Sequence, residues 1–535
     1  MLLKPSPPTI RSLNRFHCDP STVNTAVSRR ASGAAPTRRY DVVVVGGAIA
    51  GLAAAMAFAK RGLTVACVER DATPMPHNHL QAFEQWRRDG AGQIRHSHIL
   101  LAPLVNALRR DLPDFLDVLT AAGAEVLTFK DVARNTFEDP EFVPDDDDIA
   151  FLSCRRVVFE FLLRRYMLDT LGDDAFAFIQ GDVRGLHTRA DGDARRAAGV
   201  AVKTLRGNID IHADIVVDAS GRNTRIARWL AGAGIDPPAL LEQPCGIFYT
   251  SRFYRLKDGA DYPLLDGRAS LAGGVAGIDL GYLKAGIFRS DNRTFSITLA
   301  ADPEDEPMRV VARDREFDLA TRAIDVARPW VAPSVAAPIS KVYLYGNLAN
   351  TRRRYLRNGR PLLRGLFAIG DASIHTNPIA GRGCALGWVS ALELAETLDA
   401  ESDPGHRAAE FDARVERLVL PWYQHQVERD VEALAVNKAL QRGEDPFDFN
   451  RPDGTIDEQI QRRVIIRKGL RYAARESVDV MRLLFRQVNL LDPPGLRNER
   501  PDLARLFLEG YRKTADEDDA PRPSRAEFLD AVRAT

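Results

Sequence analysis

Residues 39–70 read RYDVVVVGGAIAGLAAAMAFAKRGLTVACVER, and their pattern is the strongest indication of the fold. Its first part, 40–45, is an apolar, β-branched run typical of a strand buried on both faces of a parallel sheet. A glycine-rich turn follows at 46–51, then an alanine-rich helix, and then a second buried strand, 64–68, that ends at Glu69. Strand, turn, helix, strand and terminal acid in this order predict a dinucleotide-binding unit. The alternative is a glycine-rich turn that binds nothing.

Each residue of the turn has a physical role in such a unit. Gly46 lets the chain leave the strand sharply, a small residue at 48 lets the backbone approach a pyrophosphate, and Gly51 lets the helix lie close to the sheet. The helix N-terminus faces the phosphates with free N–H groups and a partial positive charge. Glu69 is placed to accept hydrogen bonds from an adenosine ribose, which favours FAD or NAD over a 2′-phosphorylated cofactor. Ala48 departs from GxGxxG, because its methyl group replaces the middle glycine.

Composition excludes several classes of protein. The 535 residues are enough for two or three domains, and 73 basic against 73 acidic residues give no charge bias towards nucleic acid. No apolar run reaches the roughly 18 residues of a membrane span. Five cysteines without CxxC spacing suit a reducing cytoplasm, where we expect the protein to lie. Residues 1–38 contain one acid, Asp19, and predict a disordered leader; a transit peptide or a twin-arginine signal at Arg29-Arg30 is the alternative.

A second motif follows near residue 370. Residues 366–369 predict a buried strand that ends in Gly370-Asp371, and the loop SIHTNPIAGRG, 373–383, precedes a long helix. The dipole of this helix would stabilise the negative charge of a reduced flavin. Asp371 would accept hydrogen bonds from a polyhydroxy chain such as the ribityl.

Together with DASGRNTR at 218–225, these two motifs carry a resemblance to a known family. The chain resembles the FAD-dependent monooxygenases of the p-hydroxybenzoate hydroxylase fold, which include squalene-epoxidase-like, polyether-epoxidase, halogenase and geranylgeranyl-reductase branches. The motifs span residues 40–400 and are specific for the superfamily but not for a substrate. The resemblance implies FAD, with NADH or NADPH as its electron donor.

The resemblance also implies site residues. The pyrophosphate would lie on the first turn, the adenosine ribose on Glu69, the ribityl on Asp371 and the isoalloxazine ring on the loop that ends at Gly383. The expected cofactor-binding residues are Gly46, Gly47, Ala48, Gly51, Glu69, Arg70, Gln93, Arg95, Arg155 (or its neighbour Arg156), Asp218, Gly370, Asp371, Pro378, Gly381 and Gly383.

Two departures from the family affect the expected chemistry. Ala219-Ser220-Gly221-Arg222 replaces the usual order of the central motif, which puts hydride-donor binding in doubt. Pro329-Trp330-Val331-Ala332-Pro333 is the nearest sequence to the Trp-x-Trp-x-Ile-Pro motif of tryptophan halogenases, which makes halogenation an unfavoured reaction.

The domain organisation follows from changes in periodicity. We expect an α/β fold with a Rossmann-like FAD-binding domain over 39–236 and 346–400, an inserted antiparallel-sheet substrate domain over 237–345, and a helical C-terminal region over 401–535. The substrate would bind beneath the antiparallel sheet, where aromatic residues gather: Phe248, Tyr249, Phe253, Tyr254, Tyr282 and Phe288. The basic segment 462–486 predicts either a solvated helix face or a peripheral membrane contact.

Histidines and cysteines supply the remaining candidates for chemistry. The pairs His77/His79 and His96/His98 have no third ligand in a suitable spacing, so we expect no metal site. His375, just before Pro378, is a candidate acid or base, with a packing role as the alternative. Cys384 is expected to be a small core residue.

The predicted function is a monooxygenase that hydroxylates or epoxidises an apolar or aromatic small molecule with O₂, through a flavin C4a-hydroperoxide. One alternative is a flavin-dependent C–C reductase or dehydrogenase of the geranylgeranyl-reductase type. The other alternative is a non-catalytic carrier with a degenerate FAD site, which is suggested by Ala48 in place of the middle glycine.

Overall fold

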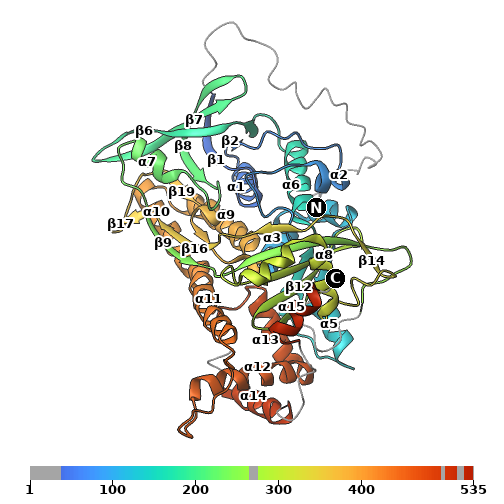
Figure 1. Ribbon diagram of the computed structural model, residues 1–535. Coiled ribbons are helices and arrows are strands. Elements are labelled where there is room, and N and C mark those ends of the chain that lie inside the picture. Colours follow the sequence, from blue (N-terminus) through green and yellow to red (C-terminus); the bar gives the residue numbers. More distant parts are fainter. Residues whose placement is uncertain (1–37, 264–274, 496–500, 515–522, 534–535) are drawn as a thin grey trace, which may run out of the picture.

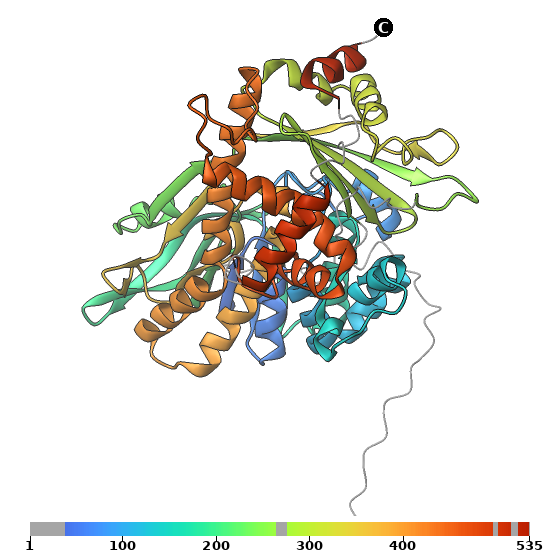
Figure 2. The same cartoon turned by 90° about the horizontal axis from the view of Figure 1, so that it is seen from below.

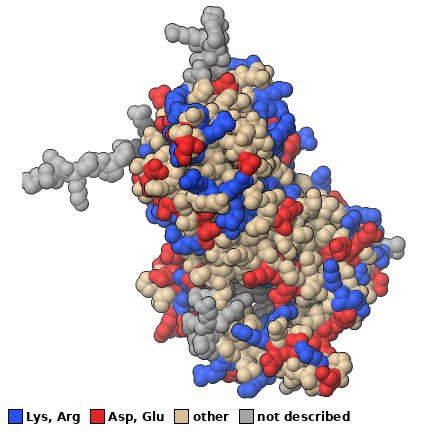
Figure 3. All heavy atoms as spheres, turned by 90° about the vertical axis from the view of Figure 1, so that its left-hand side faces the viewer, with Lys and Arg blue, Asp and Glu red and all other residues tan. Residues whose placement is uncertain are grey.

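The computed structural model describes residues 38–263, 275–495, 501–514 and 523–533 (Figure 1). The predicted disordered leader, 1–38, lies outside this range except for its last residue, where the first strand begins. Charged side chains of both signs intermix over the face shown in Figure 3, in keeping with the equal numbers of acidic and basic residues.

The main sheet is parallel at its centre and has the strand order β5-β2-β1-β8-β7-β6. Residues 42–45 of β1 lie between β2 and β8, with Val42 opposite both Val65 and Ile215. The last residues of β8 also pair with β19. The strands are β1 (Arg38–Val45), β2 (Val65–Glu69), β5 (Phe176–Gln180), β6 (Asp182–Asp191), β7 (Ala194–Thr204), β8 (Gly207–Asp218) and β19 (Leu366–Ala368). The buried strands that the sequence predicts at both ends of the first unit are therefore neighbours in one parallel sheet.

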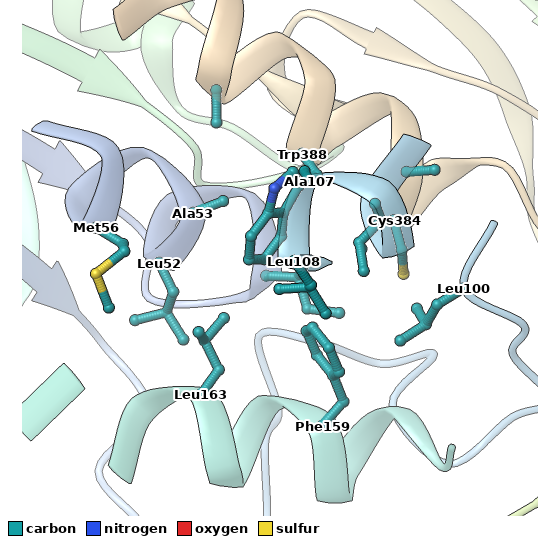
Figure 4. Packing of buried hydrophobic residues seen from close by; sticks show 14 of the residues in the cluster. Leu52, Ala53, Met56, Leu100, Ala107, Leu108, Phe159, Leu163, Cys384 and Trp388 are labelled. Carbon is teal, nitrogen blue, oxygen red and sulfur yellow. The ribbon is translucent and has the colours of Figure 1, made fainter. Parts of the chain in front are cut away.

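Four helices pack on one another beside this sheet. Figure 4 shows Leu52 of α1 (Ile49–Lys60), Phe159 and Leu163 of α6 (Arg156–Thr170) and Trp388 of α9 (Gly383–Ala400) meeting beside α3 (Ala102–Asp111). The small side chains of α1 allow the close approach of α9. Cys384 belongs to the same buried cluster, and burial raises the pKa of its thiol, so it is a core residue as predicted.

An antiparallel sheet forms the second layer, with the order β11-β12-β13-β10 and with β14 and β15 both on β10. Phe295, Ile297 and Leu299 of β13 are fully buried, as the period-two pattern predicts. Helices α8 (Asp314–Ala323) and α15 (Arg525–Arg533) contact each other over this core. The strands are β10 (Phe248–Leu256), β11 (Val275–Asp279), β12 (Leu283–Ser290), β13 (Thr294–Ala301), β14 (Ala336–Pro338) and β15 (Tyr343–Tyr345).

Smaller elements connect the layers. A three-stranded sheet pairs a strand that precedes the antiparallel sheet in the sequence with two strands that follow it. These strands are β9 (Ala239–Pro244), β16 (Ala349–Arg354) and β20 (Ile374–His375). The other α-helices and strands before residue 401 are α2 (His79–Gln85), α4 (Pro113–Ala121), β3 (Glu125–Thr128), α5 (Phe129–Thr136), β4 (Ala150–Ser153), α7 (Ile226–Gly232), β17 (Leu356–Arg357) and β18 (Arg360–Pro361). The predicted domain boundaries stay predictions.

Every regular element described after residue 401 is a helix. Figure 2 shows these helices, in orange and red, across the face seen from below. They are α10 (Pro404–Leu418), α11 (Leu420–Gln441), α12 (Glu458–Glu476), α13 (Val478–Val488), α14 (Pro501–Thr514) and α15. None of the helices in the described ranges is long and apolar enough to cross a membrane.

Candidate active site

The glycine turn after β1 is held by backbone packing that excludes larger residues. Gly46 has a φ of +109°, and a Cβ on it would stand 2.5 Å from the carbonyl oxygen of Ala219. A Cβ on Gly51 would stand 1.8 Å from the carbonyl oxygen of Gly46. Ala48 is the N-cap of α1 and has no side-chain cap. The N–H groups in the first turn of α1 are therefore available to donate hydrogen bonds to a ligand.

Glu69 binds this turn from the end of β2. One carboxylate oxygen accepts hydrogen bonds from the Gly47 N–H at 3.0 Å and from Arg88 at 2.7 Å, and the other accepts one from the Asp71 N–H at 2.9 Å. Burial alone would raise the pKa of Glu69, but Arg88, the Asp71 N–H and Arg164 together hold it below its usual value. That Glu69 contacts a ribose stays a prediction. Glu69 also positions the glycine turn, a role that the sequence did not indicate.

A buried group of charges lies behind the turn. Arg88 pairs with Glu69, with Asp71 at 3.1 Å and with Glu160 of α6. Arg164 donates to the carbonyl oxygen of Gly47 at 2.8 Å. Because each buried guanidinium here faces carboxylates, the charges compensate one another and fix the turn against α6.

The second motif lies on the wall of a cavity of about 570 Å³. Asp371 follows β19, and α9 begins at Gly383 without a side-chain cap. This cavity adjoins a smaller one of about 60 Å³, with which it shares Ala48, Gly90, Ala219 and Ser220. Of the predicted cofactor-binding residues, seven line the large cavity: Ala48, Gln93, Gly370, Asp371, Pro378, Gly381 and Gly383. The small cavity is lined by Gly46, Glu69 and Arg70, as well as by Ala48.

The other five predicted residues line neither cavity. Gly47 and Gly51 belong to the packing of the turn. Asp218 accepts hydrogen bonds from Ser220 and Thr224 and so holds the shape of its own loop. Arg95 donates to the carbonyl oxygens of Phe83 and Trp86, at 2.9 and 3.1 Å.

Arg155 is the fifth of these residues, and its position differs from the expectation for a cofactor-binding residue. It forms a fully buried ion pair with Asp291 at 2.7 Å, and this pair joins α6 to the antiparallel sheet. Its neighbour Arg156 lines the large cavity instead. The Nε atom of Arg156 is buried, makes no hydrogen bond among the described residues, and lies 3.7 Å from the carboxylate of Glu160, with which it forms an ion pair.

His98 lies beside Arg156 and was not predicted as a site residue. Its Nδ1 lies 2.9 Å from the carbonyl oxygen of His96, which makes Nδ1 the donor, and its Nε2 lies 3.5 Å from Arg156. Burial, with help from Arg156, lowers the pKa of His98 to about 3. His98 is therefore neutral at physiological pH and presents an acceptor nitrogen towards Arg156.

His96 joins the loop before α3 to the antiparallel sheet. Its Nδ1 lies 3.0 Å from the hydroxyl of Ser251, and hydroxyl contacts of 2.7 and 2.6 Å continue through Thr298 to Ser97. Burial lowers the pKa of His96 to about 3. The described residues contain no group of three or more side chains that could hold a metal ion.

These two histidines predict an acid-sensitive fold. An unfolded histidine has a pKa near 6.5, so below this pH the unfolded chain takes up protons that the folded chain excludes, and the free energy of unfolding falls as the pH falls. We expect a loss of about 2 kcal/mol per histidine between pH 7 and pH 5, measured by urea unfolding. His98→Gln should remove its own share of this loss, whereas the exposed control His406→Gln should not. An equal pH dependence in His98→Gln and the unsubstituted protein would contradict the assignment.

His375 lines the large cavity, as expected for an acid or base near a bound ring. Its Nδ1 lies 2.6 Å from the carbonyl oxygen of Ala349, so Nδ1 carries a proton and donates this hydrogen bond. Catalysis by His375 stays a prediction.

Three of the six aromatic residues expected near the substrate line the cavity: Tyr249, Tyr282 and Phe288. Phe248 and Tyr254 pack in the core of the antiparallel sheet, and Phe253 packs against the nucleotide-binding part. Helix α11, which the sequence predicts only as part of a helical C-terminal region, also lines the cavity.

The residues of the two cavities fit FAD. Two helix N-termini, those of α1 and α9, lack side-chain caps and border the large cavity at Ala48 and Gly383. Such ends bind phosphate or a developing negative charge. The same wall carries Asp371, whose carboxylate can accept hydrogen bonds from hydroxyl groups, and the guanidinium of Arg156.

Comparisons with known proteins agree with this geometry. Residues 41–74 match the family model of the FAD binding domain. A probable FAD-dependent monooxygenase, PqsL from Pseudomonas aeruginosa, has a similar structure, with a TM-score of 0.51 and 17% identity over 75% of this chain and 97% of that chain. The chain has the fold of the FAD-dependent monooxygenases. The myxobacterial chondrochloren halogenase CndH shares this fold, with a TM-score of 0.51 and 19% identity over 89% of this chain and 98% of that one.

A curated relative is known from sequence. Protein Rv3254 of Mycobacterium tuberculosis (strain ATCC 25618 / H37Rv) is 28% identical over 396 residues, which is 71% of this chain and 77% of the relative. The expected fold, with a Rossmann-like FAD-binding domain, is thus confirmed. None of these similarities identifies the branch of the superfamily.

The departure at Ala48 gives a direct test of the pyrophosphate position. Ala48→Val would add two methyl groups to a side chain that lines both cavities. We expect FAD to bind at least tenfold more weakly to Ala48→Val, because the two added methyl groups occupy the space that the pyrophosphate needs at this turn. The matched variant Ala48→Gly should bind FAD as well as the unsubstituted protein does, measured by fluorescence titration. Equal affinities in Ala48→Val and Ala48→Gly would contradict this placement.

Proposed function

We propose that this protein is an FAD-dependent monooxygenase that acts on an apolar or aromatic small molecule. The observation that carries the proposal is the large cavity. It extends from the N-terminus of α1, past Asp371 and the N-terminus of α9, to the aromatic wall of the antiparallel sheet. A carrier would need no site for a flavin ring, so Gly370, Asp371 and the loop that ends at Gly383 on the same wall favour an enzyme over a carrier.

Different residues around the cavity would hold different parts of FAD. The first turn of α1 would hold the diphosphate, Asp371 the ribityl hydroxyls, and residues 378–383 the ring. Bound FAD would supply the redox chemistry, taking two electrons from NADH or NADPH and passing them to O₂. The N-terminus of α9 and the Arg156 guanidinium would stabilise negative charge on the same wall.

The substrate would lie between the ring and the sheet. Tyr249, Tyr282 and Phe288 provide an apolar surface there and exclude water from the reacting atoms. His98, neutral and fixed by its bond to the carbonyl oxygen of His96, would orient Arg156 rather than exchange protons.

A membrane contact through residues 462–486 is less favoured than a role of this segment within the protein. The segment is divided into α12 and α13 at Ser477, which caps α13. Three of its arginines pair within the chain: Arg463 with Glu432 at 3.0 Å, Arg482 with Asp146 at 2.6 Å and Arg486 with Asp492 at 2.9 Å.

Anaerobic reduction followed by exposure to ¹⁸O₂ tests the proposed function. We expect NADH or NADPH to bleach the flavin absorbance, and we expect label from ¹⁸O₂ to appear in an aromatic substrate. Bleaching with substrate turnover but without ¹⁸O in the product would favour a reductase. A protein that binds FAD and is reduced by neither donor would count against the proposed electron source.

A further inference from the structure

The cavity wall formed by α11 uses one face of that helix. Six residues, with the spacing of a single helical face, line the cavity: Gln426, Arg429, Asp430, Ala433, Leu434 and Asn437. The helix lies close to the chain before β10 and to the β11–β12 turn. A Cβ on Gly246 would stand 2.4 Å from Leu434, and one on Gly281 would stand 2.3 Å from Leu440. The wall is therefore fixed in position.

One end of this wall carries a buried carboxylate. Asp430 is 5% exposed and accepts hydrogen bonds from the side-chain amides of Asn350, Asn377 and Gln426 at 2.7–2.9 Å. A carboxylate has about four acceptor positions, so one remains for a ligand. Burial raises the pKa of Asp430, and the three amides and the nearby Arg429 offset only part of this effect.

The other end carries a second carboxylate in a similar setting. Asp302 is 2% exposed, lines the cavity, and accepts hydrogen bonds from the Asn437 amide at 3.2 Å and from the Glu304 N–H at 2.8 Å. Two acceptor positions remain. Its pKa is raised by burial and by the nearby Glu304 and Asp305.

The two carboxylates lie on either side of an apolar stretch. Asp430 and Asn437 are seven residues apart, or about 10 Å along the helix axis. Ala433 and Leu434 line the cavity between them, and Tyr282 and Phe288 line it from the sheet. We propose that the cavity takes an elongated, rigid, apolar substrate with a hydrogen-bond donor, such as a hydroxyl, at each end, held by Asp430 and Asp302. This proposal rests on the proposed function, since it concerns the substrate of the same site.

The test measures binding of three probes to the FAD-loaded protein by calorimetry: biphenyl-4,4′-diol, 4-hydroxybiphenyl and biphenyl. A hydrogen bond to a charged group is worth roughly tenfold or more in affinity, so we expect each added hydroxyl to tighten binding about tenfold. In Asp302→Asn or Asp430→Asn, the diol should bind no more than about twofold tighter than the mono-ol. In the double variant, the three probes should bind alike. Asp412→Asn, a half-buried carboxylate outside both cavities, should keep the full preference.

Two results would overturn the proposal: equal binding of the three probes to the unsubstituted protein, or a diol preference that survives in the double variant. Asp430 also holds the amides next to the 378–383 loop, so the FAD content of each variant is measured first. If Asp430→Asn loses FAD, then Asp302→Asn alone decides the result. FAD content and O₂ uptake in the same preparations report on the proposed function, and their failure is distinguishable from loss of the diol preference.

Discussion

Substitution of Gly51 by alanine is expected to abolish FAD binding and to lower the free energy of unfolding by about 3 kcal/mol. The added Cβ would stand 1.8 Å from the carbonyl oxygen of Gly46, which belongs to the backbone of the turn itself. Neither atom can move away without shifting either α1 or the turn, and each shift displaces the N–H groups that face the phosphates. Apoprotein titrated with FAD, and urea unfolding, measure the two effects.

Gly232→Ala is the matched control, because Gly232 ends helix α7 and a Cβ there would meet nothing within 4 Å. It should leave both FAD affinity and stability almost unchanged. A Gly51→Ala protein that binds FAD with normal affinity would show that the turn does not position the cofactor.

Loss of Arg88 is the second change for which we expect a large effect. Arg88→Met would leave Glu69, Asp71 and Glu160 buried, and within the described ranges the remaining ion pairs of these carboxylates are those with Arg156 and Arg164. Removing one partner of a buried ion pair costs about 3–5 kcal/mol, and we expect a loss of that size in urea unfolding. The loss should be greatest near neutral pH. The lowered pKa of Glu69 means that its pairing stabilises the fold above the unfolded value, near 4.5, and that this contribution disappears as the pH falls through the folded value.

A double substitution separates the lost charge from the lost packing. In Arg88→Met/Glu160→Gln, one unpaired carboxylate is removed, so this variant should be more stable than Arg88→Met alone. Arg110→Met, which removes an exposed arginine paired with Asp111, should cost less than about 1 kcal/mol. If Arg88→Met cost no more than this control, the buried charges would not fix the glycine turn.

The parts of the site that the sequence predicted are those in which local geometry restricts residue type. The turn at 46–51 and the loop at 370–383 each need small residues within a few positions of a helix N-terminus, so the motif is visible in a single stretch. The fold class was predictable for a related reason, because buried strands and period-two strands differ in their hydrophobic pattern.

The rest of the site depends on contacts between distant residues. Arg155 and Arg156 are adjacent in the sequence. Arg155 does not line the cavity because it binds Asp291, which lies 136 residues later. The cavity-lining role of α11 also depends on contacts with residues that are distant in the sequence. Its cavity face becomes visible only when Gly246 and Gly281 place the helix against the antiparallel sheet. The hairpin of β6 and β7, which extends the parallel sheet, has Asp191-Gly192 in its turn, a pair typical of hairpin turns, so this element was predictable from the sequence.

We infer that the two adjoining cavities hold one FAD, and the flavin content of the purified protein tests this. After incubation with excess FAD and removal of the unbound cofactor, the protein should be yellow and should release one FAD per chain on denaturation. A folded protein that stays colourless and releases none would contradict the account.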